Sequence, residues 1–290
     1  MALITSPPSN PKARRPGLAK LVPDVTSAAL VDAAESKPEP EAAEFRRILL
    51  SDVVVKSQKR VFFGRKWNAY DLATASVILA MHCLCLFAPF QFHWRALLVA
   101  VALYVVTGLF GITLSFHRNL SHRSFKVPKW LEYFFAYCGV QALQCGGPNN
   151  VGDLKKQPFY RFLEKTYVIH PIALGALLYG LGGFPFLVWG MGVRVVWVYH
   201  ITWLINSACH VWGKQLWKTG DLSRNNGWVA LLSFGEGWHN NHHAFEYSAR
   251  HGLEWWELDM TWYVVKLLQA IRLATDVKVP TEVQKKRMAI

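Results

Sequence analysis

The sequence predicts an all-α integral membrane protein, with four transmembrane helices in two hairpins and a histidine-rich extramembrane cap on the side of both termini. Hydrophobic residues make up 52% of the 290 residues, and the mean hydropathy of +0.15 lies above that of ordinary soluble domains. Four uncharged apolar stretches are each about long enough for a helix that crosses roughly 30 Å of hydrocarbon. These predicted spans are residues 72–94, 96–116, 166–193 and 195–213.

Basic residues near the span ends predict the topology. Lysines and arginines are frequent between residues 56 and 66, ahead of the first span, and between residues 118 and 129, after the second. The turns inside the two hairpins hold only Arg95 and Arg194. Because the basic connections of a membrane protein share one face, the N-terminus, the middle segment and the C-terminal third are expected together, with the histidine groups on or near that face.

The net charge of +13 does not indicate a nucleic-acid-binding protein, because the basic residues flank apolar spans and do not line one aromatic-studded surface. Anionic lipid headgroups or an acidic redox partner fit this arrangement better. The five cysteines have neither zinc-finger nor iron–sulfur spacing, and most lie in or beside apolar segments. They are expected to be buried, reduced thiols.

Residues 1–44 differ from the rest of the chain. The first 23 residues contain Lys12, Arg14, Arg15 and Lys20 with Ser, Thr and Pro but no acidic residue, which is typical of an organelle transit peptide. A disordered cytosolic tail is the alternative. Residues 35–44, rich in Pro, Ala and Glu, are interpreted as a linker. The membrane domain is therefore expected over residues 45–290.

Three histidines, His239, His242 and His243, are the strongest indication of a metal site. Spacings of three and four place all three on one side of a helical turn, and imidazole nitrogen is a ligand that suits iron, copper or zinc. Glu236, just before them, either orients a ligating ring or is an ordinary surface carboxylate. The sequence leaves both open.

A second candidate pair, His117 and His122, lies where the second predicted span ends. A spacing of five places the two side chains about 140° apart on a straight α-helix, so they converge on a metal only if the helix bends or frays there. Taken alone, the pair is better explained as two interfacial histidines in a basic loop than as metal ligands.

A third candidate pair, Asn206 and His210, lies near the end of the fourth predicted span and shares one helix face. A polar pair inside an apolar helix indicates a functional site, with a structural hydrogen bond between helices as the alternative. Among the other histidines, His170 is a candidate substitute ligand, and His251 is expected at a headgroup or partner surface. His82, His93 and His200 are not expected to bind metal.

Nitrogen ligands beside a membrane favour oxidation of a molecule buried in that membrane. Breaking an unactivated C–H bond requires a metal and oxygen, because protein side chains cannot supply such chemistry. The spans would hold an acyl chain, and no catalytic residue is expected apart from the metal ligands. No HExxH motif for zinc hydrolysis occurs. No iron–sulfur, Rossmann or haem motif occurs either, so electrons must come from another protein.

From about Phe45 onward the chain resembles the plant plastid acyl-lipid desaturases of the stearoyl-CoA-desaturase-like family. The motifs that carry the resemblance are GITLSFHRNLSH at residues 111–122, NSACH at 206–210 and GEGWHNNHH at 235–243. The resemblance implies a chloroplast membrane enzyme with O2 as co-substrate, ferredoxin as electron donor and association with other desaturases. It also implies two irons, with Asn206 contacting iron through water and with these ligands: His117, His122, His210, His239, His242 and His243.

The chain departs from the family pattern between Gln144 and Cys145. The relatives continue there into a second histidine motif, His-Arg-x-His-His, followed by an acidic stretch, and three family iron ligands belong to that segment. We therefore expect a membrane-lipid acyl desaturase by descent, impaired by the loss of these ligands. The alternatives are an acyl hydroxylase, or a non-catalytic membrane protein that binds lipid or an intact desaturase.

Overall fold

The computed structural model describes residues 45–56, 66–140 and 152–290. Residues 44–290 form one compact unit. The predicted all-α class is confirmed except for one short antiparallel hairpin, in which β1 (Phe45–Arg47) pairs with β2 (Val54–Lys56). The predictions for residues 1–44, for Cys145 and for the junction at Gln144 lie outside the described residues.

The first helical hairpin joins α1 (Ala69–Cys85) to α2 (Trp94–Tyr104). A capping box fixes the start of α1, because Asn68 accepts a hydrogen bond from the backbone of Asp71 and the Asp71 carboxylate accepts one from Asn68. The second helix continues without a break into a π-helix, η1 (Val105–Ser121). Residues 94–121 are therefore one apolar helix of 28 residues, long enough to cross a membrane.

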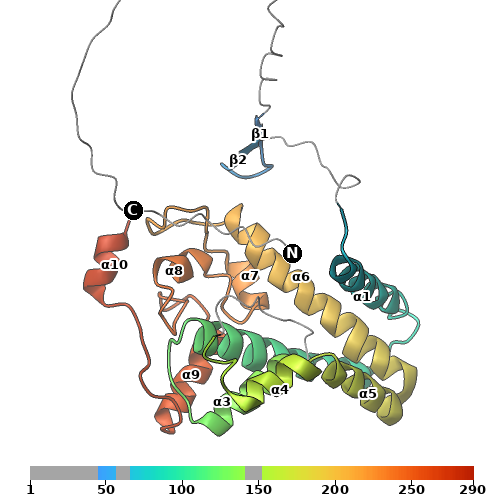
Figure 1. The fold of residues 1–290 in the computed structure, drawn as a ribbon. Coiled ribbons are helices and arrows are strands. Elements are labelled where there is room, and N and C mark those ends of the chain that lie inside the picture. The colour runs from blue at the N-terminus through green and yellow to red at the C-terminus, as the bar shows by residue number, and fades with distance from the viewer. Residues whose placement is uncertain (1–44, 57–65, 141–151) are drawn as a thin grey trace, which may run out of the picture. The chain divides into compact units, whose positions relative to one another are not determined.

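The second hairpin turns at Gly183, not at Arg194 as the sequence predicted. Gly183 has φ 66° and ψ −158°, a conformation that only glycine adopts readily. Across this turn Leu178 packs against Met191, so the chain folds back on itself (Figure 1). The expected turn at Arg194 is wrong because this arginine is 2% exposed inside the helix and donates from Nε to the carbonyl of Gly190 at 2.7 Å.

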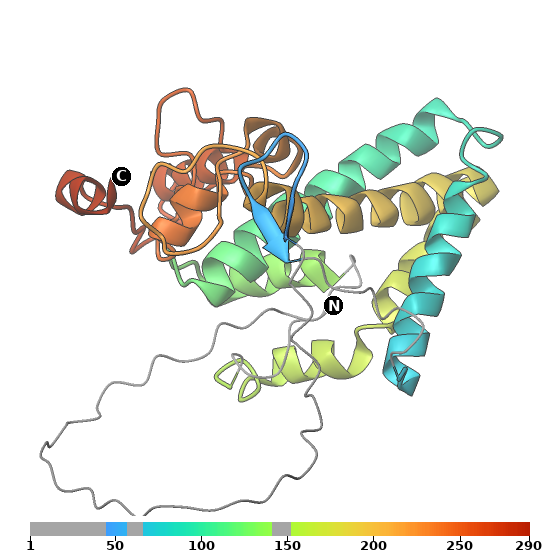
Figure 2. The same ribbon diagram turned by 90° about the horizontal axis from the view of Figure 1, so that it is seen from above.

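The elements of this hairpin run from residue 169 to residue 210, the second apolar stretch among the described residues that is long enough for a membrane. In Figure 2, α1 crosses the second helical arm of this hairpin, which it contacts over residues 188–207. The successive elements are α5 (Ile169–Leu187), the π-helix η3 (Val188–Val193), α6 (Arg194–Ser207) and the 3₁₀ turn η4 (Ala208–His210).

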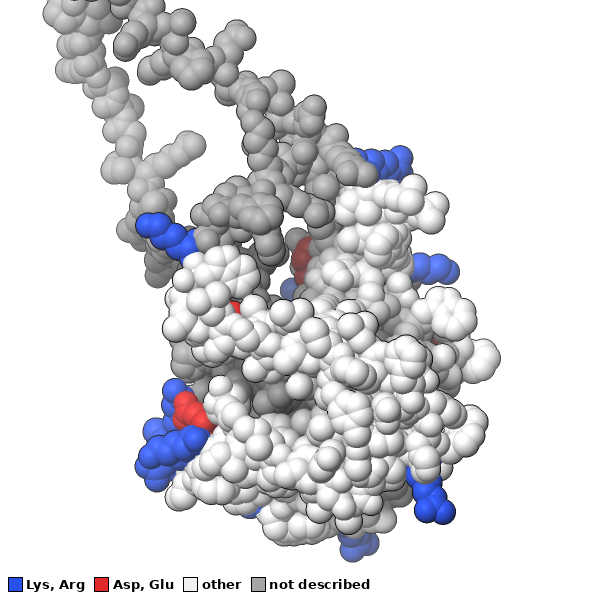
Figure 3. Space-filling model, turned by 90° about the vertical axis from the view of Figure 1, so that its right-hand side faces the viewer, with Lys and Arg blue, Asp and Glu red and all other residues white. Residues whose placement is uncertain are grey.

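The apolar helices expose large hydrophobic side chains along their length. The face drawn in Figure 3 is mostly uncharged, and the lysines and arginines visible there lie toward its margins. This arrangement is typical of a surface that contacts lipid. Two of the described cysteines, Cys138 and Cys209, are buried free thiols as predicted, whereas Cys83 is an exposed free thiol on α1. Examples of the exposed leucines are Leu72, Leu79, Leu98, Leu177 and Leu181.

The end of η1 is held by α3 (Lys129–Val140) and α9 (Met260–Ala270). Gly111 permits the close approach of η1 and α3, because a Cβ at this position would lie 2.3 Å from the backbone nitrogen of Gly139. A buried apolar cluster joins the three helices: Leu114, Phe125, Leu131, Phe135, Val265 and Leu268. The other helices are α4 (Pro158–Thr166), α7 (Gly227–Leu232), α8 (His239–Ala244) and α10 (Glu282–Met288).

Candidate metal centre

The π-helical winding of η1 brings His117 and His122 together. The backbone N–H of His122 donates to the carbonyl of His117 at 3.1 Å, which is the five-residue hydrogen bond of a π-helix. The two rings have centroids 4.8 Å apart. The spacing predicted that His117 and His122 converge only if the helix departs from straight α-helical geometry. The π-helical winding provides this departure.

The short helix α8 carries the other strong motif. Gly235 precedes it with φ 110°, and Gly237 passes so close to α7 that a Cβ there would lie 2.1 Å from the backbone nitrogen of Ala230. Only glycine fits such a close approach. Along the single turn of α8, His239 and His242 are buried and His243 is half-buried.

Six of the seven predicted ligands fall into two groups of three histidines. The first group is His117, His122 and His242, and the second is His210, His239 and His243; within each group the potential ligand atoms lie within 4.8 Å of one another. Nε2 of His117 is 3.2 Å from Nε2 of His242. Because α8 contributes to both groups, they are neighbours, with the ring centroids of His242 and His243 5.5 Å apart.

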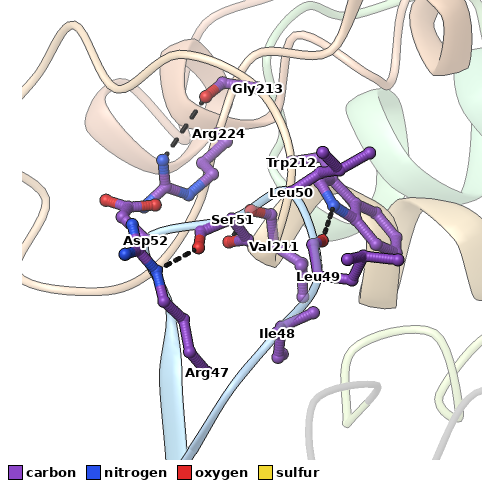
Figure 4. Close-up of a pocket in the computed structure, with 10 residues that line it drawn as sticks. All are labelled: Arg47, Ile48, Leu49, Leu50, Ser51, Asp52, Val211, Trp212, Gly213 and Arg224. Atoms are coloured by element: carbon purple, nitrogen blue, oxygen red, sulfur yellow. Dashed lines mark hydrogen bonds and ion pairs between the residues drawn. The ribbon is translucent and has the colours of Figure 1, made fainter.

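The loop of the β-hairpin contacts the segment that follows His210. Ser51 Oγ donates to the carbonyl of Val211 at 2.6 Å, and Asp52 forms an ion pair with Arg224 at 2.9 Å. These residues line an open cavity (Figure 4). The hairpin therefore helps to hold the polypeptide on the C-terminal side of His210.

Asn206 and His170 lie outside the two histidine groups, and the expected contact of Asn206 with iron through water stays a prediction. The amide of Asn206 is exposed and donates from Nδ2 to the carbonyl of Thr202 at 2.8 Å. Nε2 of His170 lies 2.9 Å from the hydroxyl of Thr166. The described structure gives neither residue a contact with the histidine groups.

Each group has a carboxylate behind one of its rings. Glu236 is 4% exposed, and its Oε2 lies 2.5 Å from Nδ1 of His117. In the second group, Oδ2 of Asp221 lies 2.6 Å from Nδ1 of His243. A carboxylate on the nitrogen away from the metal is the usual support of a ligating histidine. Of the two alternatives for Glu236, the structure supports the residue that orients a ring over the surface carboxylate. The sequence did not indicate Asp221, because it lies in a polar loop without a motif.

Arg118 fixes the Glu236 carboxylate. The arginine is fully buried, and it donates from Nη2 to Oε1 of Glu236 at 2.9 Å and from Nη1 to Oδ2 of Asp259 at 2.9 Å. A buried arginine between two carboxylates satisfies the charges of all three groups. This network fixes the position of the Glu236 carboxylate.

The surface position expected for His251 is wrong. His251 is 1% exposed, and its ring centroid lies 4.5 Å from that of His242. The loop is drawn inward by Asp259, whose Oδ2 accepts from the backbone N–H of His251 at 2.7 Å. No local sequence pattern predicts the burial of His251, because the contacts that bury its ring are made by the tertiary fold.

Electrostatics favour the neutral form of His122 and His239 and the charged form of Glu236. Burial and then the neighbouring histidines lower the pKa of His122 to about 4 and the pKa of His239 to about 3. Burial alone would raise the pKa of Glu236, but its interactions with His117, His251 and the Arg118 guanidinium hold this pKa well below its ordinary value. Neutral imidazoles backed by an anion present lone pairs suited to a metal cation.

The donor set fits metal ions that prefer nitrogen. Each group offers three imidazoles, and three protein ligands with remaining open positions are the pattern of a catalytic metal site. Iron is among the metals that such sites hold. The two neighbouring groups have room for one ion each.

Comparison with known proteins identifies the family. The family profile described as fatty acid desaturase matches residues 150–273, which include the whole second group. The chain is also 62% identical over 294 aligned residues to the chloroplastic palmitoyl-monogalactosyldiacylglycerol delta-7 desaturase of Arabidopsis thaliana, an alignment covering 85% of this chain and 79% of the relative. The chain belongs to the fatty acid desaturase family.

Other desaturases align over similar lengths. The acyl-CoA C20 Delta5-desaturase of Anemone leveillei is 49% identical over 296 residues, covering 86% of this chain and 95% of the relative. The Delta-9 acyl-lipid desaturase 1 of Arabidopsis thaliana is 49% identical over 280 residues, covering 80% of this chain and 92% of the relative. Membership of the desaturase family makes iron the expected metal for the two histidine groups.

Proposed function

We propose that this chain is an oxygen- and iron-dependent fatty acyl desaturase that acts on a membrane lipid of the plastid. The observation that carries the proposal is the convergence of three distant histidine motifs into two three-imidazole groups at the end of apolar helices. The similarity to a chloroplastic galactolipid desaturase supports the substrate class and the location.

The residues of this chain would hold two irons, and bound iron would supply the oxygen chemistry that side chains lack. His117, His122 and His242 bind one ion in this proposal, and His210, His239 and His243 bind the other. The reaction removes two hydrogens from adjacent acyl carbons. With O2, two electrons and two further protons, these hydrogens leave as two molecules of water. The electrons come from an external donor, for which we propose ferredoxin docked on the basic face.

We propose that four helical segments cross the membrane as two hairpins, with the histidine groups on the face of the N- and C-termini. The turn at Gly183 and the apolar exposed surfaces support this topology. By this proposal the chain is a multi-pass protein of a chloroplast membrane. Its acyl substrate would then reach the histidine groups from within the bilayer.

We also propose that a segment is absent between Gln144 and Cys145. The alignment with the delta-7 desaturase spans 294 positions but only 85% of this chain, or about 247 residues, so about 47 aligned positions have no counterpart here. The alignment with the Delta-9 acyl-lipid desaturase 1 likewise leaves about 48 aligned positions without a counterpart in this chain. By its resemblance to the family the segment would carry three further histidine ligands. Its absence predicts weaker iron binding and slower desaturation.

Expression in a host that lacks the product, followed by mass spectrometry of its lipids, tests the proposal. The chain should form a new double bond slowly, and a variant with the family segment inserted between Gln144 and Cys145 should form it faster. Absence of the double bond from both proteins, with electron donor present, would overturn the proposal. A hydroxylated product would instead identify a hydroxylase. Iron binding without any product would identify a non-catalytic relative.

A further inference from the structure

His251 is a buried histidine outside both groups, and its ring has no hydrogen bond. Its side chain is 0% exposed, and neither Nδ1 nor Nε2 has a hydrogen-bond partner among the described residues. Buried polar atoms are almost always paired, and a neutral imidazole has one donor and one acceptor nitrogen to satisfy. Nδ1 of the ring faces the Glu236 carboxylate, so the unpaired Nε2 points to a partner that the polypeptide does not supply.

The placement of His251 repeats that of His117 with respect to Glu236. Oε2 of Glu236 lies 2.5 Å from Nδ1 of His117 and 3.5 Å from Nδ1 of His251. In His117 the opposite nitrogen, Nε2, faces His242 within the first group. A ligating histidine commonly has a carboxylate near one nitrogen and metal on the other. By this parallel, Nε2 of His251 is its metal-binding atom.

The ring of His251 is also close to the first group. Its centroid lies 4.5 Å from that of His242 and 5.6 Å from that of His117. We propose that His251 is a fourth imidazole ligand of the metal ion held by His117, His122 and His242. His251 is not among the residues whose ligand atoms lie within 4.8 Å of one another, so its ring must move toward the ion when the ion binds.

This inference rests on the proposed iron-dependent function and deepens it. The first group provides three nitrogens, and the segment proposed to be absent would have supplied more. A fourth imidazole from outside the histidine motifs restores part of the coordination that is lost. It also accounts for the buried Nε2, which would otherwise lack a partner.

The backbone around His251 is anchored independently of its ring. The N–H groups of His251 and Gly252 donate to Oδ2 of Asp259 at 2.7 and 3.1 Å. The carbonyl of His251 accepts from Nδ2 of Asn241 at 2.8 Å. Substitution of the ring is therefore expected to leave the loop in place, so that a change in metal binding reports on the imidazole itself.

The test is a Co²⁺ titration of the metal-free, detergent-purified full chain, followed by visible absorption and elemental analysis. The variants are His251→Ala and His251→Gln. Glutamine fills most of the volume of the imidazole, so the second variant serves if the alanine variant is unstable. The control is His200→Ala, which removes an exposed histidine of α6 outside both groups. We expect two bound ions in the unaltered chain. Both His251 variants should bind one of them about tenfold or more weakly, with changed absorption bands.

Free imidazole should restore the Co²⁺ spectrum of the His251→Ala variant by entering the vacated space, and the His200→Ala control should behave as the unaltered chain. Unchanged affinity and spectrum in both His251 variants would overturn the inference and leave the proposed centre intact. If Co²⁺ binding became weaker while the spectrum stayed the same and free imidazole gave no rescue, His251 would have a structural role and the inference would be overturned. Failure of the unaltered chain to bind Co²⁺ would overturn the centre and the inference together.

Discussion

The carboxylate of Glu236 lies 2.5 Å from Nδ1 of His117, although 119 positions separate the two residues in the chain. This contact joins the end of η1 to the turn before α8. It implies that the rings are oriented by the protein and not by the ion alone.

The Glu236→Gln variant should weaken metal binding at the first group by about 10- to 100-fold, because the amide keeps the shape but loses the charge behind His117. Metal titration measured separately for the two ions checks this prediction. Asp221→Asn is the matched variant for the second group, since Asp221 contacts His243. If either substitution weakened the binding of both ions equally, this result would contradict the assignment of one carboxylate to each group.

Arg118→Met should lower the free energy of unfolding by about 3–5 kcal/mol, because it leaves the carboxylates of Glu236 and Asp259 buried without their cation. Thermal unfolding in detergent measures this loss. The control is Arg123→Met, which removes an exposed ion pair with Asp153 and should change stability by no more than about 1 kcal/mol. Similar effects of the two substitutions would show that the buried network does not stabilise the cap.

Gly237→Ala should destabilise the protein by about 1–3 kcal/mol and reduce binding of both metal ions. The added methyl would lie 2.1 Å from the backbone nitrogen of Ala230, so α8, which serves both groups, must shift. Gly152→Ala provides the control, because a Cβ there meets nothing within 4 Å. Full metal content in the Gly237→Ala variant would mean that the close packing of α8 on α7 is not required.

The metal-free protein should lose stability as the pH falls from about 7.5 to about 5. The folded-state pKa is lowered to about 4 for His122 and about 3 for His239, whereas the unfolded value is about 6.5. Below about pH 6.5 the unfolded chain binds protons that these folded groups do not, so the free energy of unfolding falls with pH.

Melting temperatures across this pH range check the prediction. The double variant His122→Gln, His239→Gln should show a smaller decrease, because it lacks two of the groups that titrate only on unfolding. A melting temperature that rises on acidification, or an equal decrease in the double variant, would contradict the neutral state assigned to these rings.

The sequence predicted the helical membrane class and six of the residues that converge, because apolar length and histidine spacing are local properties. It could not predict the π-helical winding that pairs His117 with His122, since its geometry assumed a straight α-helix. It placed a turn at Arg194 because a charge interrupts the apolar pattern there. In the structure this charge is satisfied inside the helix, and Gly183 provides the turn.

Of the residues that contact the histidine groups, the sequence indicated Glu236 but not Asp221 or the burial of His251. Asp221 and His251 have no motif of their own, and their roles arise from contacts across the fold with His243 and Glu236. The contact of Asn206 with iron through water stays a prediction, and in the structure its amide donates to the carbonyl of Thr202. Site residues supported by tertiary contacts therefore required the structure.

The amount of iron in the purified full chain, measured by elemental analysis after anaerobic loading, tests the central claim most directly. The account predicts about two irons per chain, one for each group. It also predicts loss of iron from the first group in His242→Ala and from the second in His239→Ala. Iron near zero in the unaltered chain, or undiminished iron in both variants, would contradict it.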